Sequence, residues 1–298
     1  MSTFEDNQTQ DVPDGIPGLF PETETGGRVT VMLAAFEGWN DAGEAASDAL
    51  KFLGTQWGGE KISTIDADEF YDFQFTRPVI RRNSSGLRRI KWPTTRISKA
   101  SVPESNLDVI LVHGVEPSYK WRGYTAELVG MAKELDVDCL VLVGALLADV
   151  PHTRPIPVTV SSDDDLIRES LNVEASTYEG PIGIVGVLAE VGQLADIPTL
   201  SMWAAVPHYV GQSPSPKAQL ALLNRLEELL RVGLDTQALA EEAEAWERGV
   251  DELSTEDPEV AAYVRQLEEA KDTADLPEAS GESIAREFER YLKKRRKD

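Results

Sequence analysis

All three histidines of the chain follow closely on a run of apolar residues. His113 lies near the end of "LDVILVHG", His152 follows "CLVLVGALLADVP", and His208 follows "PTLSMWAAVP". Imidazole and carboxylate side chains can transfer protons near neutral pH, so such residues are candidates for catalysis. Because the carboxyl ends of parallel strands meet at one edge of a sheet, we expect these side chains to gather there.

Other polar residues follow the same apolar runs, and we expect their side chains at the same edge of the sheet. The candidates for catalysis are Asp149, His152 and Glu37. The candidates for ligand binding are Asn40, Asp41, His113, Glu116, Arg154 and His208. A carboxylate and a histidine could act as general base and acid on a small ligand, with Arg154 contacting an anion. No two histidines have the close spacing of a metal site, so we predict neither a metal nor a cofactor.

A purely structural interpretation of these residues is the stronger one. In it Asp41 caps a helix, while Pro151 and Pro155 fix a turn as the chain leaves a buried strand. His152 and Arg154 then satisfy loop carbonyls and do no chemistry. Both interpretations of the stretch from Asp149 to Arg154 stay open at this point.

Four apolar runs indicate buried strands, and helical patterns lie between them. Asp41 followed by Glu44 has the spacing of a capping box, and small apolar residues then recur at helical spacing. Strands that alternate with helices in this way predict an α/β fold with a mostly parallel sheet. The four expected strands are 28–36, 107–114, 139–147 and 198–206.

The chain divides by composition into three parts. Residues 1–26 have no apolar periodicity and predict a disordered or extended tail. Residues 27–213 carry the α/β pattern, and 214–298 predict an appended all-helical subdomain. The segment 71–99 departs from the α/β pattern, because strand-like halves flank "NSSG", a hairpin signal.

The predicted hairpin is basic although the protein is strongly acidic. The net charge is −23 and the calculated pI about 4.5, yet residues 73–103 contain several cations and no acid. Cations commonly blunt an exposed strand edge; an acidic partner or RNA is the alternative. The overall negative charge repels a phosphate backbone, so we expect no general nucleic-acid role.

Several compartments and motifs are excluded by simple features. A single cysteine, Cys139, fits a reducing compartment, and no signal peptide or apolar run of membrane-spanning length is evident. We therefore expect a cytoplasmic protein with no membrane association. The glycines of "GPIGIVG" match no phosphate-binding fingerprint, and neither GxSxG nor HExxH occurs.

Four stretches in order resemble one known family. "FEGWNDAG", "VLVGALLADVPHTRP", "GPIGIVGVL" and "WAAVPHYV" resemble the proteasome assembly chaperone 2 family over about residues 28–215. The long acidic helical C-terminus resembles the actinobacterial type. This resemblance implies a phosphorylase/hydrolase-like α/β fold, similar to that of nucleoside phosphorylases, and a symmetric homo-oligomer, with a trimer as the best guess.

The resemblance favours a non-enzymatic assembly or interaction factor with a protein partner. The alternative is a small-ligand-binding protein or an enzyme of nucleoside-phosphorylase-like fold, acting on a nucleoside-like or phosphorylated substrate. Family members that dock on the proteasome often end in a hydrophobic residue, tyrosine and any residue. This chain ends in Arg296–Lys297–Asp298, with Tyr291–Leu292 further inside, so docking through that tail is not expected.

Overall fold

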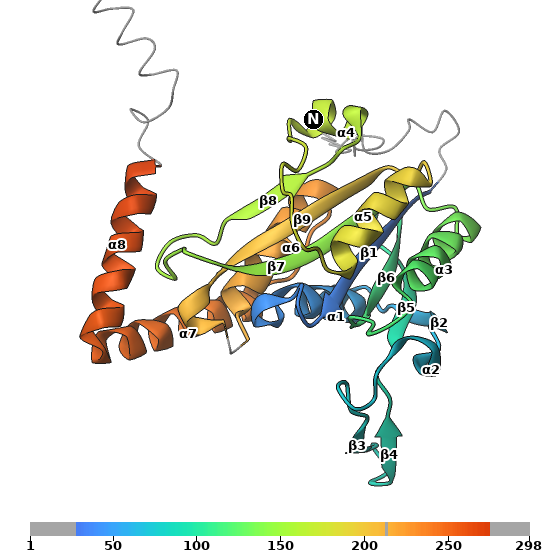
Figure 1. Cartoon of the computed structure of the whole chain (residues 1–298), viewed down its shortest axis with the longest axis horizontal. Coiled ribbons are helices and arrows are strands. Elements are labelled where there is room, and N and C mark those ends of the chain that lie inside the picture. Colours follow the sequence, from blue (N-terminus) through green and yellow to red (C-terminus); the bar gives the residue numbers. More distant parts are fainter. Residues whose placement is uncertain (1–27, 212–213, 275–298) are drawn as a thin grey trace, which may run out of the picture.

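The computed structural model describes residues 28–211 and 214–274, and its centre is a seven-stranded mixed sheet (Figure 1). The strand order is β2-β5-β6-β1-β7-β9-β8. Neighbours within β6-β1-β7-β9 are parallel, and the outer pairs are antiparallel. The strands are β1 (Val29–Glu37), β2 (Glu60–Thr64), β5 (Thr95–Ser101), β6 (Leu107–Val115), β7 (Cys139–Ala148), β8 (Val158–Ser161) and β9 (Thr199–Pro207).

The four parallel strands are the four that the sequence predicts. In β1 every residue before Glu37 is buried, because helices cover both faces of the sheet. The expectation of an α/β fold with a mostly parallel centre is therefore confirmed. The outer strands β2 and β8 were not predicted, and β5 joins the main sheet although it overlaps the predicted hairpin segment.

Helices pack on both faces of the sheet. In Figure 1, α3 and α5 lie in front of the sheet and α1 and α6 lie behind it. Within the described residues, none of the helices is long and apolar enough to cross a membrane. The helical segments are η1 (Ala42–Glu44), α1 (Ala45–Gln56), α2 (Ala67–Phe70), α3 (Trp121–Glu134), α4 (Asp165–Leu171), α5 (Ile184–Leu194), η2 (His208–Val210), α6 (Pro216–Leu230), α7 (Gln237–Glu256) and α8 (Pro258–Ala274).

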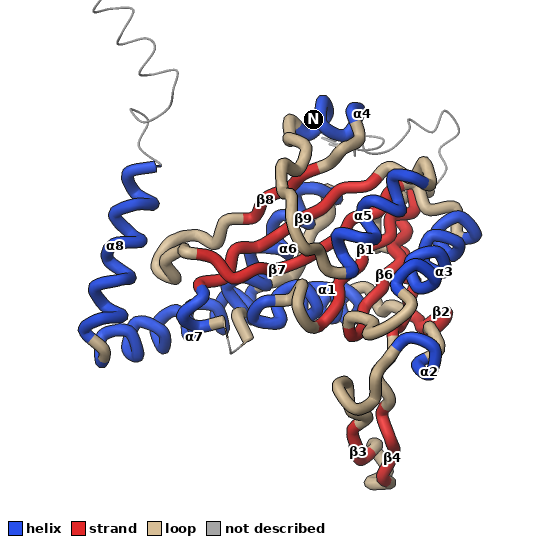
Figure 2. The backbone as a smooth tube through the Cα atoms, viewed as in Figure 1, coloured by secondary structure: helices blue, strands red, loops and turns tan. Residues whose placement is uncertain are grey.

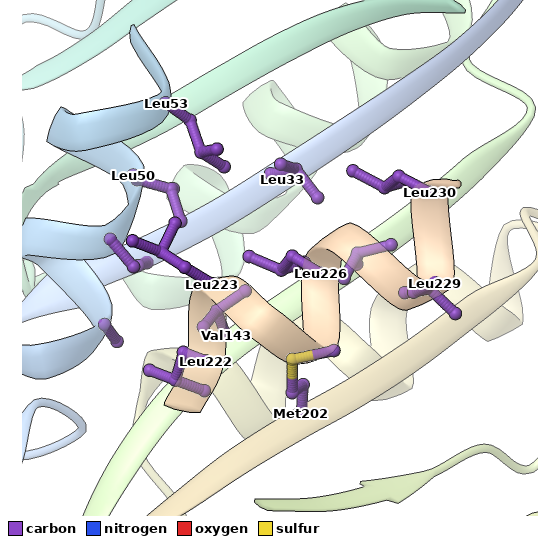
Figure 3. Close-up of a cluster of buried hydrophobic side chains, with 14 of the residues drawn as sticks. Leu33, Leu50, Leu53, Val143, Met202, Leu222, Leu223, Leu226, Leu229 and Leu230 are labelled. Atoms are coloured by element: carbon purple, nitrogen blue, oxygen red, sulfur yellow. The ribbon is translucent and has the colours of Figure 1, made fainter. Parts of the chain in front are cut away.

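Helix α6 is part of the α/β core, although its sequence lies beyond the boundary expected at residue 213. Leu222, Leu223 and Leu226 are fully buried in the same cluster as Leu33 and Val143 of the sheet (Figure 3). Helix α7 joins the same cluster at its start through Leu239, and Figure 1 shows α8 standing at the side of the molecule. The tail expected over 1–26 lies outside the described residues.

The predicted hairpin forms and is separate from the main sheet. It pairs β3 (Val79–Arg82) with β4 (Arg88–Lys91) around the turn at Asn83–Gly86, where Gly86 has a φ of 76°. The Asn83 Oδ1 atom accepts hydrogen bonds from the backbone N–H groups of Ser85 and Leu87, which closes the turn. All residues of both strands are exposed, and the hairpin projects away from the body of the protein (Figure 2).

Candidate functional site

The candidate residues lie at the carboxyl edge of the parallel strands, but they form separate clusters. Asn40 and Glu116 follow β1 and β6 and meet at the N-terminus of α5, while the neighbouring Asp41 binds the N-terminus of α1. Asp149, His152, Arg154 and His208 follow β7 and β9 and face α7 and α8. The strand-end loops thus divide the predicted site in two.

Glu116 joins the turn after β1 to helix α5. Its Oε1 atom accepts a hydrogen bond from Asn40 Nδ2 at 2.6 Å and another from the Ile184 backbone N–H at 2.8 Å. A carboxylate is favoured at a helix N-terminus, where free N–H groups and the helix dipole both stabilise negative charge. Gly183 is required at the same junction, because a Cβ atom there would lie 2.1 Å from Asn40 Oδ1.

Asp41 is buried and binds the backbone of α1. Its Oδ1 atom accepts hydrogen bonds from the N–H groups of Ala46 at 2.8 Å and Ser47 at 3.2 Å. Burial raises the pKa of the Asp41 carboxyl above its ordinary value, and these hydrogen bonds only partly oppose that shift. Among the described residues nothing hydrogen-bonds to Asp41 Oδ2 or Asn40 Oδ1, so two buried oxygens are left unpaired.

The capping box predicted from Asp41 and Glu44 is wrong in detail. Gly43 has a φ of 61° and Glu44 a φ of 53°, so a 3₁₀ turn separates Asp41 from the start of α1 at Ala45. Glu44 is exposed and makes no side-chain cap. Asp41 nevertheless accepts hydrogen bonds from N–H groups in the first turn of α1. It lies four residues before the helix begins at Ala45, whereas a capping-box residue stands directly before the helix.

Among the described residues, the side chains of His113 and Glu37 make no hydrogen bond to either cluster. Glu37 pairs with Lys51 of α1 at 3.0 Å. Burial lowers the pKa of His113, and the positive charge of Lys51 lowers it further. Nothing among the described residues hydrogen-bonds to His113 Nδ1.

His152 is fully buried, and both of its ring nitrogens are engaged. The Tyr209 hydroxyl lies 2.8 Å from Nδ1 and also accepts a hydrogen bond from the His152 backbone N–H. The Nε2 atom lies 3.0 Å from Asp251 Oδ1 on α7. In the tautomer with its proton on Nε2, Nε2–H donates to Asp251 and the Tyr209 hydroxyl donates to Nδ1. Burial raises the pKa of Tyr209 to about 12, so its hydroxyl stays protonated.

The rest of the loop binds helix α8. Arg154 makes two hydrogen bonds of 2.7 Å to the Asp272 carboxylate and contacts Glu268, which also accepts from the Thr153 hydroxyl. Asp149 accepts a hydrogen bond from the Tyr263 hydroxyl. Its carboxylate also lies 3.1 Å from His208 Nδ1. The loop that follows β7 therefore attaches α7 and α8 to the sheet.

An open groove lies beside the Asn40–Asp41–Glu116 cluster. Its volume is about 1270 Å³, and its walls come from the turn after β1, the end of β7, strands β8 and β9, and the segment before α5. Leu146 and Leu147 are about half exposed in it, and Trp39 is 63% exposed. No lysine or arginine lines the groove in the part of the chain that the structure describes. Its acidic lining residues are Asp41, Glu44, Glu174 and Glu179.

Sequence reasoning missed two sets of residues. The first set consists of the helical partners of the loop: Asp251, Tyr263, Glu268 and Asp272. The second set consists of groove residues, above all Leu146 and Leu147, which the apolar run "CLVLVGALLA" marks as ordinary buried strand. No three histidine, cysteine, aspartate or glutamate side chains within 28–211 and 214–274 are grouped as a metal site needs.

A family model described as the PAC2 family matches residues 35–254 of the chain. The chain belongs to the PAC2 family. The resemblance seen in four stretches of the sequence is thereby confirmed, and the matched range extends through α6 and most of α7. Among curated proteins, no sequence matches this PAC2 chain.

Two solved structures of high identity share this fold. A PAC2 family protein from Streptomyces avermitilis is 50% identical, with a TM-score of 0.74; the match covers 79% of this chain and 99% of that one. A proteasome-assembly chaperone homologue from Mycobacterium tuberculosis is 46% identical, with a TM-score of 0.71 and coverage of 78% and 99%. An archaeal homologue of proteasome-assembly chaperone from Pyrococcus furiosus, 17% identical, shares the fold with a TM-score of 0.56, covering 82% of this chain and 96% of its own.

Proposed function

We propose that this PAC2 protein is a non-enzymatic assembly or protein-interaction factor. Its family and its 46% identity to a proteasome-assembly chaperone homologue both favour an assembly role. By the same likeness, the class of partner we propose is a subunit of a multi-chain assembly such as the proteasome. We also propose that the protein is cytoplasmic and works as a homo-oligomer, with a trimer as the simplest ring.

The observation that carries this proposal is the use of the catalytic-type residues within the fold. A catalytic site needs an acid, a base or a nucleophile directed at a bound substrate. Here the side chains of His152, Arg154 and Asp149 hydrogen-bond to Tyr209 and to side chains of α7 and α8. What remains open at the strand ends is the apolar groove.

The groove has the chemistry of a surface for a protein segment. Trp39, Leu146 and Tyr178 expose apolar area in it, and exposed apolar patches on soluble proteins commonly mark interaction sites. In the described part of the chain, all charged groups that line the groove are acidic. We therefore propose a partner segment that combines apolar side chains with lysine or arginine.

Photo-crosslinking tests the proposal. The photo-reactive amino acid p-benzoylphenylalanine replaces Tyr178 in the groove or, as a control, Leu194, which is 84% exposed outside it. We expect position 178 alone to yield one defined product, which mass spectrometry identifies as a chain of a multi-subunit assembly or a second copy of this protein. The substitution Leu147→Asp should lower the yield at least tenfold. Equal products from the two positions would refute the proposal.

A second candidate function is the binding of a small nucleoside-like ligand. The unpaired oxygens Asn40 Oδ1 and Asp41 Oδ2 favour it, because they could accept hydrogen bonds from ligand N–H groups. The acidic lining disfavours a phosphorylated ligand. Adenosine, guanosine and inosine would each be tested by thermal shift on the parent and on Asp41→Ala. A saturable rise at a hundredfold excess over Kd, worth about 2.7 kcal/mol, that is lost in the variant would establish this function.

A further inference from the structure

The β3–β4 hairpin is a bare two-stranded sheet with apolar side chains in water. Isolated two-stranded hairpins are marginally stable in water, and a third strand or packing against a helix is needed for independent stability. Ile80 and Ile90 are directly opposite in the register, so they share one face, and each is more than half exposed. Leu87 beside the turn is 56% exposed, and Phe75 before the hairpin is 91% exposed. The hairpin therefore has the composition of an uncovered interface.

Cations flank this apolar patch on both strands. Arg82 and Arg88 are opposite one another and lie on the same face as Ile80 and Ile90, because side chains two residues apart share a face. Arg81, Arg89 and Lys91 occupy the other face. Within the described residues none of these five cations pairs with a carboxylate, although Arg82 donates to the Gly86 carbonyl. Among the described residues the hairpin therefore has no acidic counter-charge.

The groove described above is complementary to the hairpin in both respects. It offers exposed leucines at 146 and 147, and it carries the exposed acids Glu174 and Glu179 with no lining cation among the described residues. The hairpin stands apart from the sheet, as Figures 1 and 2 both show. A second copy of the chain brings the two complementary surfaces together.

We propose that the hairpin of one copy docks in the groove of a second copy, with Arg82 and Arg88 facing Glu174 and Glu179. The proposal rests on the proposed function, in that it names one protein segment that the groove binds. The two surfaces are different, so the contact runs head to tail and closes into a ring when the rotation between copies allows it. A client segment of like chemistry then competes with the hairpin for the groove.

The test measures the mass of the full chain by size-exclusion chromatography with light scattering and by sedimentation velocity. The hairpin variant is R82E/R88E, and the groove variant is E174K/E179K. The control is R122E/K133E, which makes the same charge change as the hairpin variant at exposed positions of α3. We expect the parent and the control to be oligomers. Each test variant should raise the dissociation constant at least tenfold, with an unchanged circular dichroism spectrum.

Mixing and combining the variants tests the head-to-tail geometry. In a 1:1 mixture the intact hairpin of the groove variant meets the intact groove of the hairpin variant, and the acidic hairpin meets the basic groove. Both contacts pair opposite charges, so we expect the mixture to associate although each variant alone does not. The combined variant R82E/R88E/E174K/E179K exchanges the charges of both surfaces, and we expect it to recover oligomers.

Several outcomes would overturn the inference. The proposed contact is ruled out if the parent is monomeric at 100 µM, or if the hairpin variant has the same mass as the parent. A mixture that stays monomeric contradicts the pairing of hairpin with groove, and a groove variant with the parent's mass shows that the groove is not part of the contact. Binding of a 20-nucleotide RNA that R82E/R88E abolishes while the mass is unchanged assigns the hairpin to nucleic acid. If R82E/R88E has the parent's mass but crosslinking at position 178 still captures another protein, only this inference fails. If the crosslinking also captures no protein, the proposed function fails as well.

Discussion

The loop after β7 and the turn after β1 occupy the same edge of one sheet and carry the same kinds of side chain. In the loop, the ring nitrogens of His152 and the guanidinium of Arg154 bind partners on η2, α7 and α8. In the turn, Asn40 and Asp41 each keep one buried oxygen without a partner among the described residues. Residue type and position at a strand end therefore do not separate an anchoring loop from an open site. Distant segments of the chain decide the difference.

The largest expected loss of stability comes from a substitution that disturbs the packing of the turn after β1. In Gly183→Ala the new Cβ atom would lie 2.1 Å from Oδ1 of the buried Asn40. Overpacking of this kind should lower the free energy of unfolding by about 3 kcal/mol in urea denaturation. The matched control is Gly249→Ala in α7, where no atom lies within 4 Å of the new Cβ. There we expect a gain of roughly 0.5–1 kcal/mol from helix propensity. Similar effects at both positions would contradict the packing argument.

A smaller loss should follow from breaking the loop after β7. His152→Ala removes a fully buried ring and leaves the Tyr209 hydroxyl and Asp251 without their partner. We expect about 2 kcal/mol less stability and faster amide exchange in α7 and α8. The exposed His208 is the control, and its alanine variant should lose no more than about 0.5 kcal/mol. If His152→Ala leaves the stability unchanged, the catalytic interpretation of the loop is favoured instead.

The pH dependence of stability sharpens the contrast at Asp41. Burial raises the pKa of this carboxyl in the folded state, so the folded chain binds the proton more tightly than the unfolded chain does. The wild type therefore loses stability as the pH rises from the ordinary value of 3.8 through the raised folded pKa. Asp41→Asn removes this loss, and urea midpoints should shift in its favour between pH 4 and pH 7. If the difference in urea midpoint between the two proteins is the same at every pH, the argument that Asp41 is buried with an unpaired oxygen is contradicted.

The smallest effect on stability is expected at the groove surface. Trp39 is 63% exposed, so Trp39→Ala should change the free energy of unfolding by about 0.5 kcal/mol or less. The same variant should reduce the crosslink yield from position 178 several-fold, because an exposed aromatic side chain supplies contact area. Leu194→Ala, outside the groove, is the control for both measurements. A large change in stability, or an unchanged yield, would contradict the assignment of this surface to binding.

The centre of the fold could be predicted because its signals are local. Each central strand is a continuous apolar run, and the β3–β4 turn is carried by Asn83 and Gly86. The outer strands β2 and β8 were missed because they are short and poorly buried, which leaves no alternating pattern. The capping box was mispredicted because the spacing of Asp41 and Glu44 does not reveal the left-handed backbone at Gly43 and Glu44.

The anchoring role of the loop could not be predicted from spacing. Asp251 is 99 residues from His152, and Asp272 is 118 residues from Arg154. Both acids lie on helices rich in glutamate and aspartate, where nothing in the sequence singles out one carboxylate as a partner. Only the three-dimensional path of α7 and α8 brings these acids to the loop.

Helix α8 is joined to the rest of the protein in part by charged contacts, and these depend on the solvent differently from the apolar core. Among the described residues only Val264 and Leu267 of α8 are buried, while Arg154 binds both Glu268 and Asp272. Dissolved salt weakens attraction between exposed charges but leaves apolar burial largely intact. Raising the ionic strength should therefore loosen this last described helix before it weakens the sheet beneath it.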